Sequence, residues 1–186
     1  TSLPYPSCII AYRAQAATAS ETIQFIYNGN SGNPPAQDPT FDAVKAEPLE
    51  IFDEVARLVE QGVTEIVFVG QNVNSYQYTF KGRVLRLSDL IEVSGSINGV
   101  ERIRYTTSHP LDMTDDLIAV YGHVPQLVSQ LHLPVQSGSN KILTKMKRNY
   151  SRETYIEVIE KLVRARPNIK ISSDFIVGFP GETDND

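Results

Sequence analysis

Four short polar segments of this 186-residue chain carry the residue types that could bind a small polar ligand. Each follows an apolar run, and they are residues 70–76 (GQNVNSY), 106–110 (TTSHP), 136–139 (QSGS) and 178–182 (GFPGE). Amides and hydroxyls can hydrogen-bond the ribose hydroxyls, amino group and carboxylate of a cofactor, and glycines let the backbone approach it. Ordinary loops between strands and helices use the same residue types, so no single segment indicates a binding site. A site is indicated because all four segments are expected on one edge of a sheet.

The histidines are weaker candidates for catalysis. His109 precedes Pro110 and is therefore held extended; it could be a base or a ligand, although a structural role is favoured. His132 is expected in the core and His123 in solvent. No Walker loop, His-Glu-x-x-His motif or Gly-x-Ser-x-Gly elbow occurs, so the sequence assigns no catalytic residue.

Two groups of cations allow more than one interpretation. Arg102 and Arg104 alternate with apolar residues, so they either line the interior of a barrel and pair with carboxylates or lie at an edge. The second group comprises Lys145, Lys147, Arg148 and Arg152, close to Tyr150. It could touch phosphate, but a solvated surface with cations near a helix end is the preferred interpretation.

Strand and helix patterns alternate from residue 47 onward. Strands are expected at 64–69, 102–106, 131–135 and 170–177, and helices at 48–62, at 87–97 and after Thr114, Ser139 and Ser151. This alternation predicts an α/β fold with parallel strands and helical crossovers. Because a closed eight-fold barrel needs about 250 residues, a partial barrel and an open doubly wound sheet remain as alternatives. Polar strand ends would then meet at one edge.

The chain divides into two unequal parts, residues 1–46 and 47–186. Eight of the ten residues 28–37 are Asn, Gly, Ser or Pro, which predicts a loop or a disordered insert. Only residues 7–12 and 22–27 are strand-like in the first part, and 14–46 are expected to be poorly ordered.

Composition excludes several classes of protein. The formal net charge of -5 argues against a dedicated nucleic-acid-binding module, but not against a catalytic domain whose RNA is held elsewhere. The single cysteine, Cys8, excludes an intramolecular disulfide framework and favours a reduced, cytoplasmic setting. No apolar run reaches about 18 residues and no signal peptide is apparent, so no membrane association is expected.

Four motifs resemble those of the tRNA methylthiotransferases of the MiaB type, which are radical S-adenosylmethionine enzymes. They are residues 70–76 (GQNVNSY), 102–110 (RIRYTTSHP), 131–139 (LHLPVQSGS) and 172–183 (SSDFIVGFPGET). The resemblance covers about residues 47–186 and implies a partial (β/α)6 barrel, a parallel sheet with outer helices.

The resemblance also implies a reaction. A [4Fe-4S] cluster splits S-adenosylmethionine, and the resulting radical starts methylthiolation at C2 of N6-isopentenyladenosine next to the anticodon. The implied partner is tRNA, through domains outside this chain, with no role for DNA. Four pairs of strand-end residues would bind S-adenosylmethionine. They are Gly70 and Gln71 at its amino group, Thr107 and Ser108 at the barrel mouth, Gln136 and Ser137 near the ribose and methionine, and Ile176 and Gly178 against the adenine.

The chain departs from this family at the cluster ligands. The family uses a C-x-x-x-C-x-x-C motif, and Cys8 matches only its third cysteine, with Thr1 and Tyr5 at the other positions. Neither residue can replace a thiolate, so no stable cluster is expected. About thirty extra residues follow Arg13; a damaged reading frame, an inserted segment and divergence remain as explanations.

Three functional hypotheses follow. The chain is a catalytic-domain fragment of a tRNA methylthiotransferase, a non-catalytic remnant that keeps the fold, or an unrelated enzyme such as an aldolase. Lys170 lies too early on its strand for a Schiff-base lysine, which counts against the third.

Overall fold

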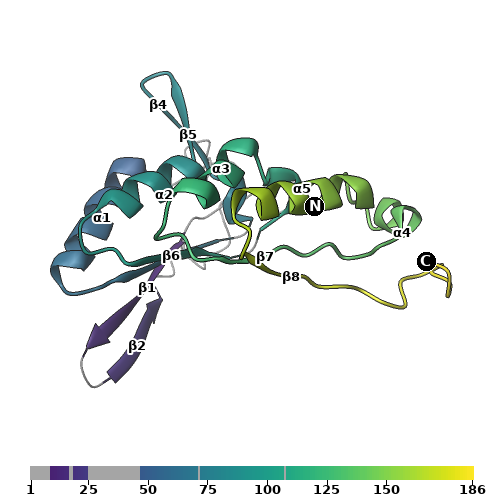
Figure 1. Ribbon diagram of the computed structural model, residues 1–186, viewed down its shortest axis with the longest axis horizontal. Coiled ribbons are helices and arrows are strands. Elements are labelled where there is room, and N and C mark those ends of the chain that lie inside the picture. The colour runs from purple at the N-terminus through teal and green to yellow at the C-terminus, as the bar shows by residue number, and fades with distance from the viewer. Residues whose placement is uncertain (1–8, 17–18, 25–46, 71, 107) are drawn as a thin grey trace, which may run out of the picture.

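The computed structural model describes residues 9–16, 19–24, 47–70, 72–106 and 108–186. It has one layer of helices over one face of a sheet, while the opposite face is open (Figure 1). The helices are α1 (Pro48–Glu60), α2 (Leu87–Ser96), α3 (Asp115–His123), α4 (Asn140–Lys145) and α5 (Arg152–Ala165). The strands are β1 (Ile9–Ala16), β2 (Ala19–Gln24), β3 (Glu65–Val69), β4 (Gln77–Phe80), β5 (Arg83–Arg86), β6 (Arg102–Tyr105), β7 (Gln130–His132) and β8 (Lys170–Ser172).

The predicted parallel strands form as a series from β3 to β8. β3 pairs in parallel with β6, and β7 pairs in parallel with β8. A parallel bridge between Ile103 and Leu127 connects β6 to the segment that leads into β7. The expected α/β class with parallel strands is therefore confirmed.

The edge of the sheet beside β3 differs from the prediction. β1 pairs antiparallel with both β3 and β2, so the sheet is mixed rather than purely parallel. Only two residues separate β1 from β2, and so short a connection can join only antiparallel strands. These strands extend to Ala16 and to Gln24, inside the segment expected to be poorly ordered; residues 25–46 lie outside the described part.

Two strands are shorter than predicted. β7 ends at His132 and β8 at Ser172: the Leu133 N–H still donates to the Ser172 carbonyl, but the Val135 N–H donates to the Ser173 hydroxyl, at 2.9 Å, instead of to a backbone carbonyl. The two segments meet again at the isolated parallel bridge between Gln136 and Phe175. β8 is therefore followed by an extended segment rather than by a continuous strand.

Local signals explain the helix boundaries. Pro48 occupies the first turn of α1, where its missing N–H has no cost. The Ser139 and Ser151 hydroxyls accept hydrogen bonds from the N–H groups of Ile142 and Thr154, at 3.4 and 3.1 Å, as their predicted capping roles require. Thr114 is the N-cap of α3 but makes no such bond.

The core lies between the helices and the sheet. Alternate strand residues point into it, including Ile66, Phe68, Ile103, Leu131 and Leu133, which are at most 2% exposed. They meet the apolar faces of the helices in a single cluster. Among the described residues, no helix combines the length and the hydrophobicity that crossing a bilayer requires.

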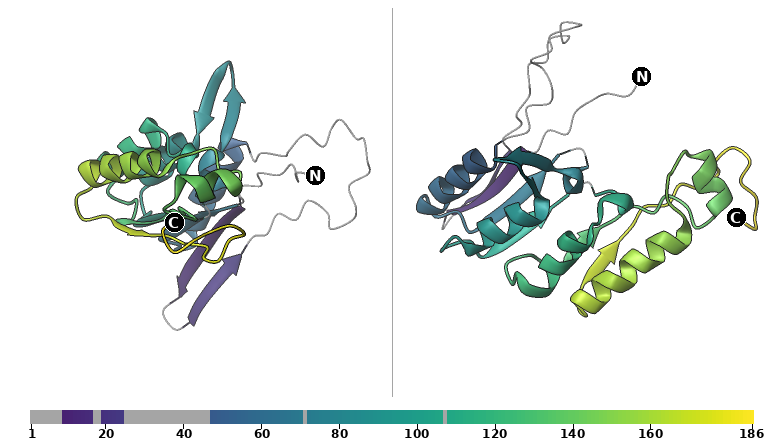
Figure 2. Two further views of the ribbon diagram at one scale, coloured as in Figure 1. Left: turned by 90° about the vertical axis from the view of Figure 1, so that its right-hand side faces the viewer. Right: turned by 90° about the horizontal axis from the view of Figure 1, so that it is seen from above.

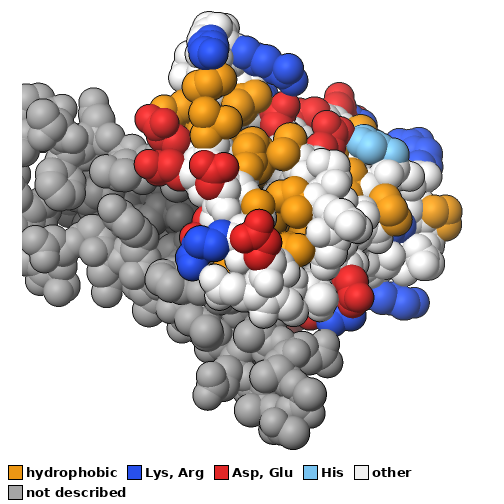
Figure 3. Space-filling model, turned by 90° about the vertical axis from the view of Figure 1, so that its left-hand side faces the viewer, with side chains coloured by type: hydrophobic (Ala, Val, Ile, Leu, Met, Phe, Trp, Pro, Cys, Tyr) orange, Lys and Arg blue, Asp and Glu red, His pale blue; other side chains and the backbone are white. Residues whose placement is uncertain are grey.

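A hairpin of β4 and β5 projects from this body (Figure 2) and was not predicted. Its two-residue turn consists of Lys81 and Gly82, both with positive φ (48° and 80°), as a tight hairpin with right-handed twist requires. The face around α1 and the hairpin shows apolar side chains flanked by acidic ones, with Lys and Arg side chains scattered around its rim (Figure 3).

Candidate functional site

The open face of the sheet carries charged side chains at its centre. Glu65 on β3 accepts hydrogen bonds from Arg104 Nε at 2.6 Å and from Arg102 Nε at 3.0 Å. Arg104 also donates to Gln130 on β7 at 3.2 Å. Of the two predicted alternatives for these arginines, pairing with a carboxylate is therefore the one observed.

Polar side chains on the open face of the sheet continue from β7 to β8. Here the prediction for His132 was wrong. His132 is not a core residue: its side chain is 43% exposed on the open face. Its Nδ1 lies 2.9 Å from Ser172 Oγ and its Nε2 lies 3.2 Å from Asp174 Oδ2. A core position would require cover on both faces of the strand, whereas helices cover only the face that holds Leu131 and Leu133. His123 is exposed, as predicted, and contacts Glu92 at 2.7 Å.

The ion pair at Glu65 makes stability depend on pH. Burial raises the pKa of this carboxyl, but the hydrogen bonds and charges of Arg104 and Arg102 outweigh burial and hold the pKa below its ordinary 4.5. A lowered folded-state pKa stabilises the fold above pH 4.5, and this contribution disappears as the pH falls through the folded-state value.

Replacing Glu65 with glutamine is therefore expected to destabilise the chain near neutral pH by about 1 kcal/mol, since both arginines are partly solvated. Urea unfolding of both proteins at neutral pH and well below pH 4.5 measures this, and the difference should shrink in acid. A difference that is constant with pH would contradict the role assigned to the ion pair.

Reciprocal hydrogen bonds join the loops after β3 and β6. Asn74 Nδ2 donates to the His109 carbonyl, and the His109 N–H donates to Asn74 Oδ1, both at 2.9 Å. Asn72 Nδ2 donates to Asp112 Oδ2 at 2.6 Å. The first two polar segments therefore lie side by side at the carboxyl edge of the sheet.

The third segment joins the same edge. The His109 ring lies edge-on to Tyr150, with centroids 5.5 Å apart, and Tyr150 donates to the Val135 carbonyl at 3.1 Å. The Gln136 carbonyl accepts from the Ile176 N–H at 2.8 Å. These contacts connect the first three segments with Ile176, two residues before the fourth, whereas Gln71 and Thr107 lie outside the described residues.

The remaining predicted site residues occupy this edge in different ways. Ser137 is buried and accepts a hydrogen bond from the Ser139 N–H at 3.1 Å. Gln136 and Gly178 have positive φ, 69° and 74°. A Cβ on Gly178 would meet no atom within 4 Å, so its backbone borders open space. Gly70 directly follows β3.

Three buried polar atoms near this edge have no hydrogen-bond partner within the described part of the chain. They are Asn72 Oδ1, Ser108 Oγ and Arg148 Nε. An unpaired buried polar group costs about 1–3 kcal/mol, a cost that a bound polar ligand would remove. Burial and the charge of Arg148 lower the pKa of His109, which Asp112 opposes, so His109 favours its neutral form beside a cation.

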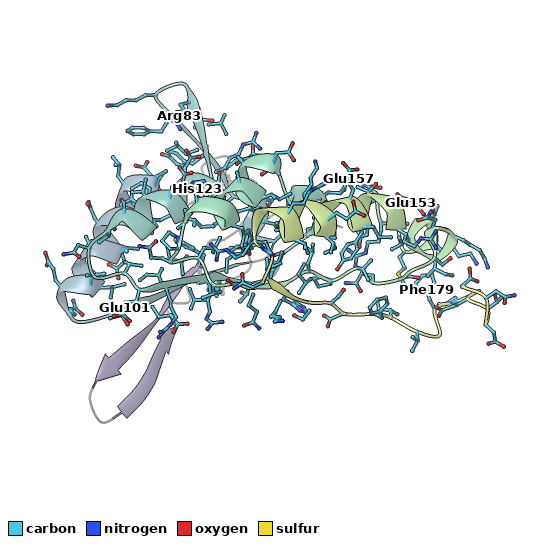
Figure 4. All side chains as sticks on the ribbon, viewed as in Figure 1. Arg83, Glu101, His123, Glu153, Glu157 and Phe179 are labelled. Carbon is cyan, nitrogen blue, oxygen red and sulfur yellow. The ribbon has the colours of Figure 1, made fainter. Side chains whose placement is uncertain are left out.

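Arg148 is the residue that sequence reasoning missed. It was grouped with solvated cations, yet it lies half-buried and has an unpaired donor. The proximity of the group to Tyr150 was the only available signal. Figure 4 draws the described side chains on the ribbon, with His123 on the helical layer and Phe179 on the segment that follows β8.

The donor set does not fit a [4Fe-4S] cluster. Such a cluster needs at least three thiolates, and the chain contains one cysteine, Cys8, which lies outside the described residues. Within the described ranges, no group of three or more His, Cys, Asp or Glu side chains could hold a metal ion.

Known proteins share this sequence pattern. A family model described as the radical SAM superfamily matches residues 30–186. The chain is 58% identical over 138 residues to a tRNA-2-methylthio-N(6)-dimethylallyladenosine synthase from Buchnera aphidicola, covering 74% of this chain and 31% of that protein. Proteins of the same name from Vibrio cholerae (56% over 138 residues; 74% and 29% covered) and Psychrobacter (54% over 143 residues; 76% and 29% covered) are also similar.

The chain thus spans about three tenths of the length of the curated relatives it matches. Because the family model covers most of the chain, the chain belongs to the radical SAM superfamily.

Proposed function

We propose that this chain is the S-adenosylmethionine-binding part of a tRNA methylthiotransferase and that its sheet is part of a (β/α)6 barrel. The observation that carries the proposal is that the polar segments after β3 and β6 meet beside unpaired buried polar atoms, with Gln136 and Ile176 bonded to each other next to them. Identity above 50% to proteins named for this reaction supports the same assignment. Residues 47–186 would form the barrel part and residues 1–46 a degenerate or inserted N-terminal segment, whose strands β1 and β2 extend the sheet beside β3.

The chemistry of the edge suits the cofactor. Arg148 and Ser108 offer unpaired donors for a carboxylate, and Asn72 offers an unpaired acceptor for an amino group or a hydroxyl. The backbone around Gly178 borders open space where an adenine could lie beside the half-exposed Ile176. Gly70, Gln71, Thr107, Gln136 and Ser137 complete the proposed site.

A second candidate function rests on the cysteine count. A chain with only Cys8 cannot supply three thiolates to a cluster, which favours a remnant that keeps the fold and binds the cofactor without radical chemistry. We assign no catalytic step to the cluster for this reason. From the resemblance to tRNA methylthiotransferases, we propose tRNA as the partner and the cytoplasm as the setting.

Amide chemical-shift mapping tests where the cofactor binds. Titrating S-adenosylmethionine into the 15N-labelled chain should shift the amides of residues 70–72, 108–109, 136–137 and 176–178. The amides of the β4–β5 hairpin, which projects from the body, serve as an internal control and should not move. Shifts confined to the hairpin, or absent from all four segments, would contradict the proposed site.

A further inference from the structure

A carboxylate joins the segment after Gly181 to the start of α4. Asp186 Oδ1 accepts a hydrogen bond from Ser139 Oγ at 2.8 Å, and its Oδ2 accepts one from Lys141 Nζ at 2.6 Å. Oδ2 also accepts from the N–H and the hydroxyl of Thr183, at 3.0 and 2.9 Å. We call these four residues the carboxylate clamp, and Figures 1 and 2 show the marked chain end beside α4.

The clamp differs from an ordinary surface ion pair, which contributes little. The Asp186 side chain is only 10% exposed, and hydrogen bonds to a carboxylate are stronger than those between neutral groups. The bonds from Lys141, Ser139 and Thr183 hold the pKa of this carboxyl well below its ordinary 3.8, so it is ionised at neutral pH. The Asp186 N–H also donates to the Thr183 carbonyl at 2.9 Å, so its own segment fixes its position as well.

Two further contacts hold the fourth polar segment, residues 178–182. Lys145 Nζ, at the other end of α4, donates to the Gly181 carbonyl at 3.3 Å. The Phe179 N–H donates to Glu182 Oε2, and the Glu182 N–H donates to the Phe179 carbonyl, both at 2.8 Å. The segment is therefore a closed turn that is bonded to α4 at Gly181 and, through the clamp, at Asp186.

The start of α4 is in turn bonded to the third polar segment. The Ser139 N–H donates to Ser137 Oγ at 3.1 Å, and Ser137 is buried. The Ser139 hydroxyl also accepts from the Ile142 N–H at 3.4 Å as the cap of α4. Because Ser139 contacts Ser137 on one side and Asp186 on the other, the clamp links the third and fourth polar segments.

We propose that the carboxylate clamp positions the fourth polar segment, so that Ile176 and Gly178 are held in place for the adenine of S-adenosylmethionine. This inference rests on the proposed function, which assigns the adenine to these two residues. Asp186 and Lys141 are positioning residues, because they act through the segment and not on the cofactor. A segment held in its binding conformation binds more tightly, since the apparent dissociation constant is the intrinsic one divided by the fraction of competent chains.

Replacing Asp186 with asparagine tests the clamp, because it removes the charge and keeps the shape. The heteronuclear NOE values of the amides of residues 179–183 should fall, which reports faster local motion. Binding of S-adenosylmethionine, followed through the amide shifts of residues 136–137 and 176–178, should weaken about fivefold. Asp184→Asn is the matched control, because it alters an exposed acid of the same segment and should change neither quantity.

Two variants of Lys141 test the other side of the clamp. Lys141→Met keeps the apolar stem but removes the donor, so it should weaken binding about twofold. Lys141→Arg keeps a charged donor and should bind like the parent chain. The NOE values of α5, which lies outside the clamp, should stay unchanged in every variant.

The outcomes separate this inference from the proposed function. Equal binding by the parent chain and Asp186→Asn, or NOE values that fall in α5 as much as in residues 179–183, would overturn the positioning role. A parent chain that binds no S-adenosylmethionine would refute the proposed function instead. The NOE comparison would then still show whether the clamp holds the segment.

Discussion

Replacing Arg166 with methionine is expected to lower the free energy of unfolding by roughly 3–5 kcal/mol. Arg166 Nε donates to the Tyr121 carbonyl at 2.5 Å and Nη2 to the Val124 carbonyl at 2.8 Å. Nη1 donates to the Leu127 carbonyl and lies 3.5 Å from Ser129 Oγ. One guanidinium thus joins the end of α5 to the end of α3 and to the segment that leads into β7.

The size of the effect follows from what the substitution leaves behind. Methionine fills a similar volume but donates no hydrogen bond, so the Tyr121, Val124 and Leu127 carbonyls each lose a charged donor. Within the described part of the chain, only the Val124 carbonyl keeps a hydrogen bond, from the Leu127 N–H. Arg164→Met is the matched control, because Arg164 lies exposed on the same helix and should change stability by less than about 0.5 kcal/mol. Urea unfolding measures both variants, and similar values for the two would contradict the proposed role of Arg166.

Restoring two cysteines is expected to change iron binding from almost none to about four irons per chain. Thr1→Cys with Tyr5→Cys completes the C-x-x-x-C-x-x-C spacing with Cys8. The original chain supplies a single thiolate and should hold no stable cluster. Anaerobic reconstitution, iron and sulfide counting and absorbance of the thiolate-to-iron band measure the difference.

The control for this experiment carries the same number of cysteines in another spacing. Thr1→Cys with Ser7→Cys offers three thiolates in the wrong arrangement and should bind clearly less iron. About four irons on the original chain, without bridging between chains, would refute the conclusion drawn from the cysteine count.

The parallel strands could be predicted because their signal is local. The apolar runs ending at Val69 and Tyr105 each alternate with a helix pattern, and such alternation specifies parallel pairing. The β4–β5 hairpin was missed although Lys81-Gly82 lies between two short alternating runs. The residues between the polar segment 70–76 and the helix expected at 87–97 were assigned no structure, and Gly82 was not used as a turn signal.

The site was predictable only in part, because part of it depends on tertiary packing. The segments at Ser108 and Gln136 follow apolar runs, so their place at the carboxyl edge could be expected from the order of the elements. The exposure of His132 depends on which face the helices cover, and the unpaired Nε of Arg148 exists only once the loops have packed together. Sequence spacing contains neither piece of information.

The proposed function requires that S-adenosylmethionine bind at the carboxyl edge of the sheet. Titration calorimetry with S-adenosylmethionine measures this binding most directly. Without a cluster to hold the amino and carboxylate groups, the remaining hydrogen bonds predict a dissociation constant on the order of millimolar, about -4 kcal/mol. Arg148→Met should weaken binding by about tenfold or more, whereas Lys147→Met, at an exposed neighbour, should not. Micromolar binding, or equal binding by both variants, would contradict the account.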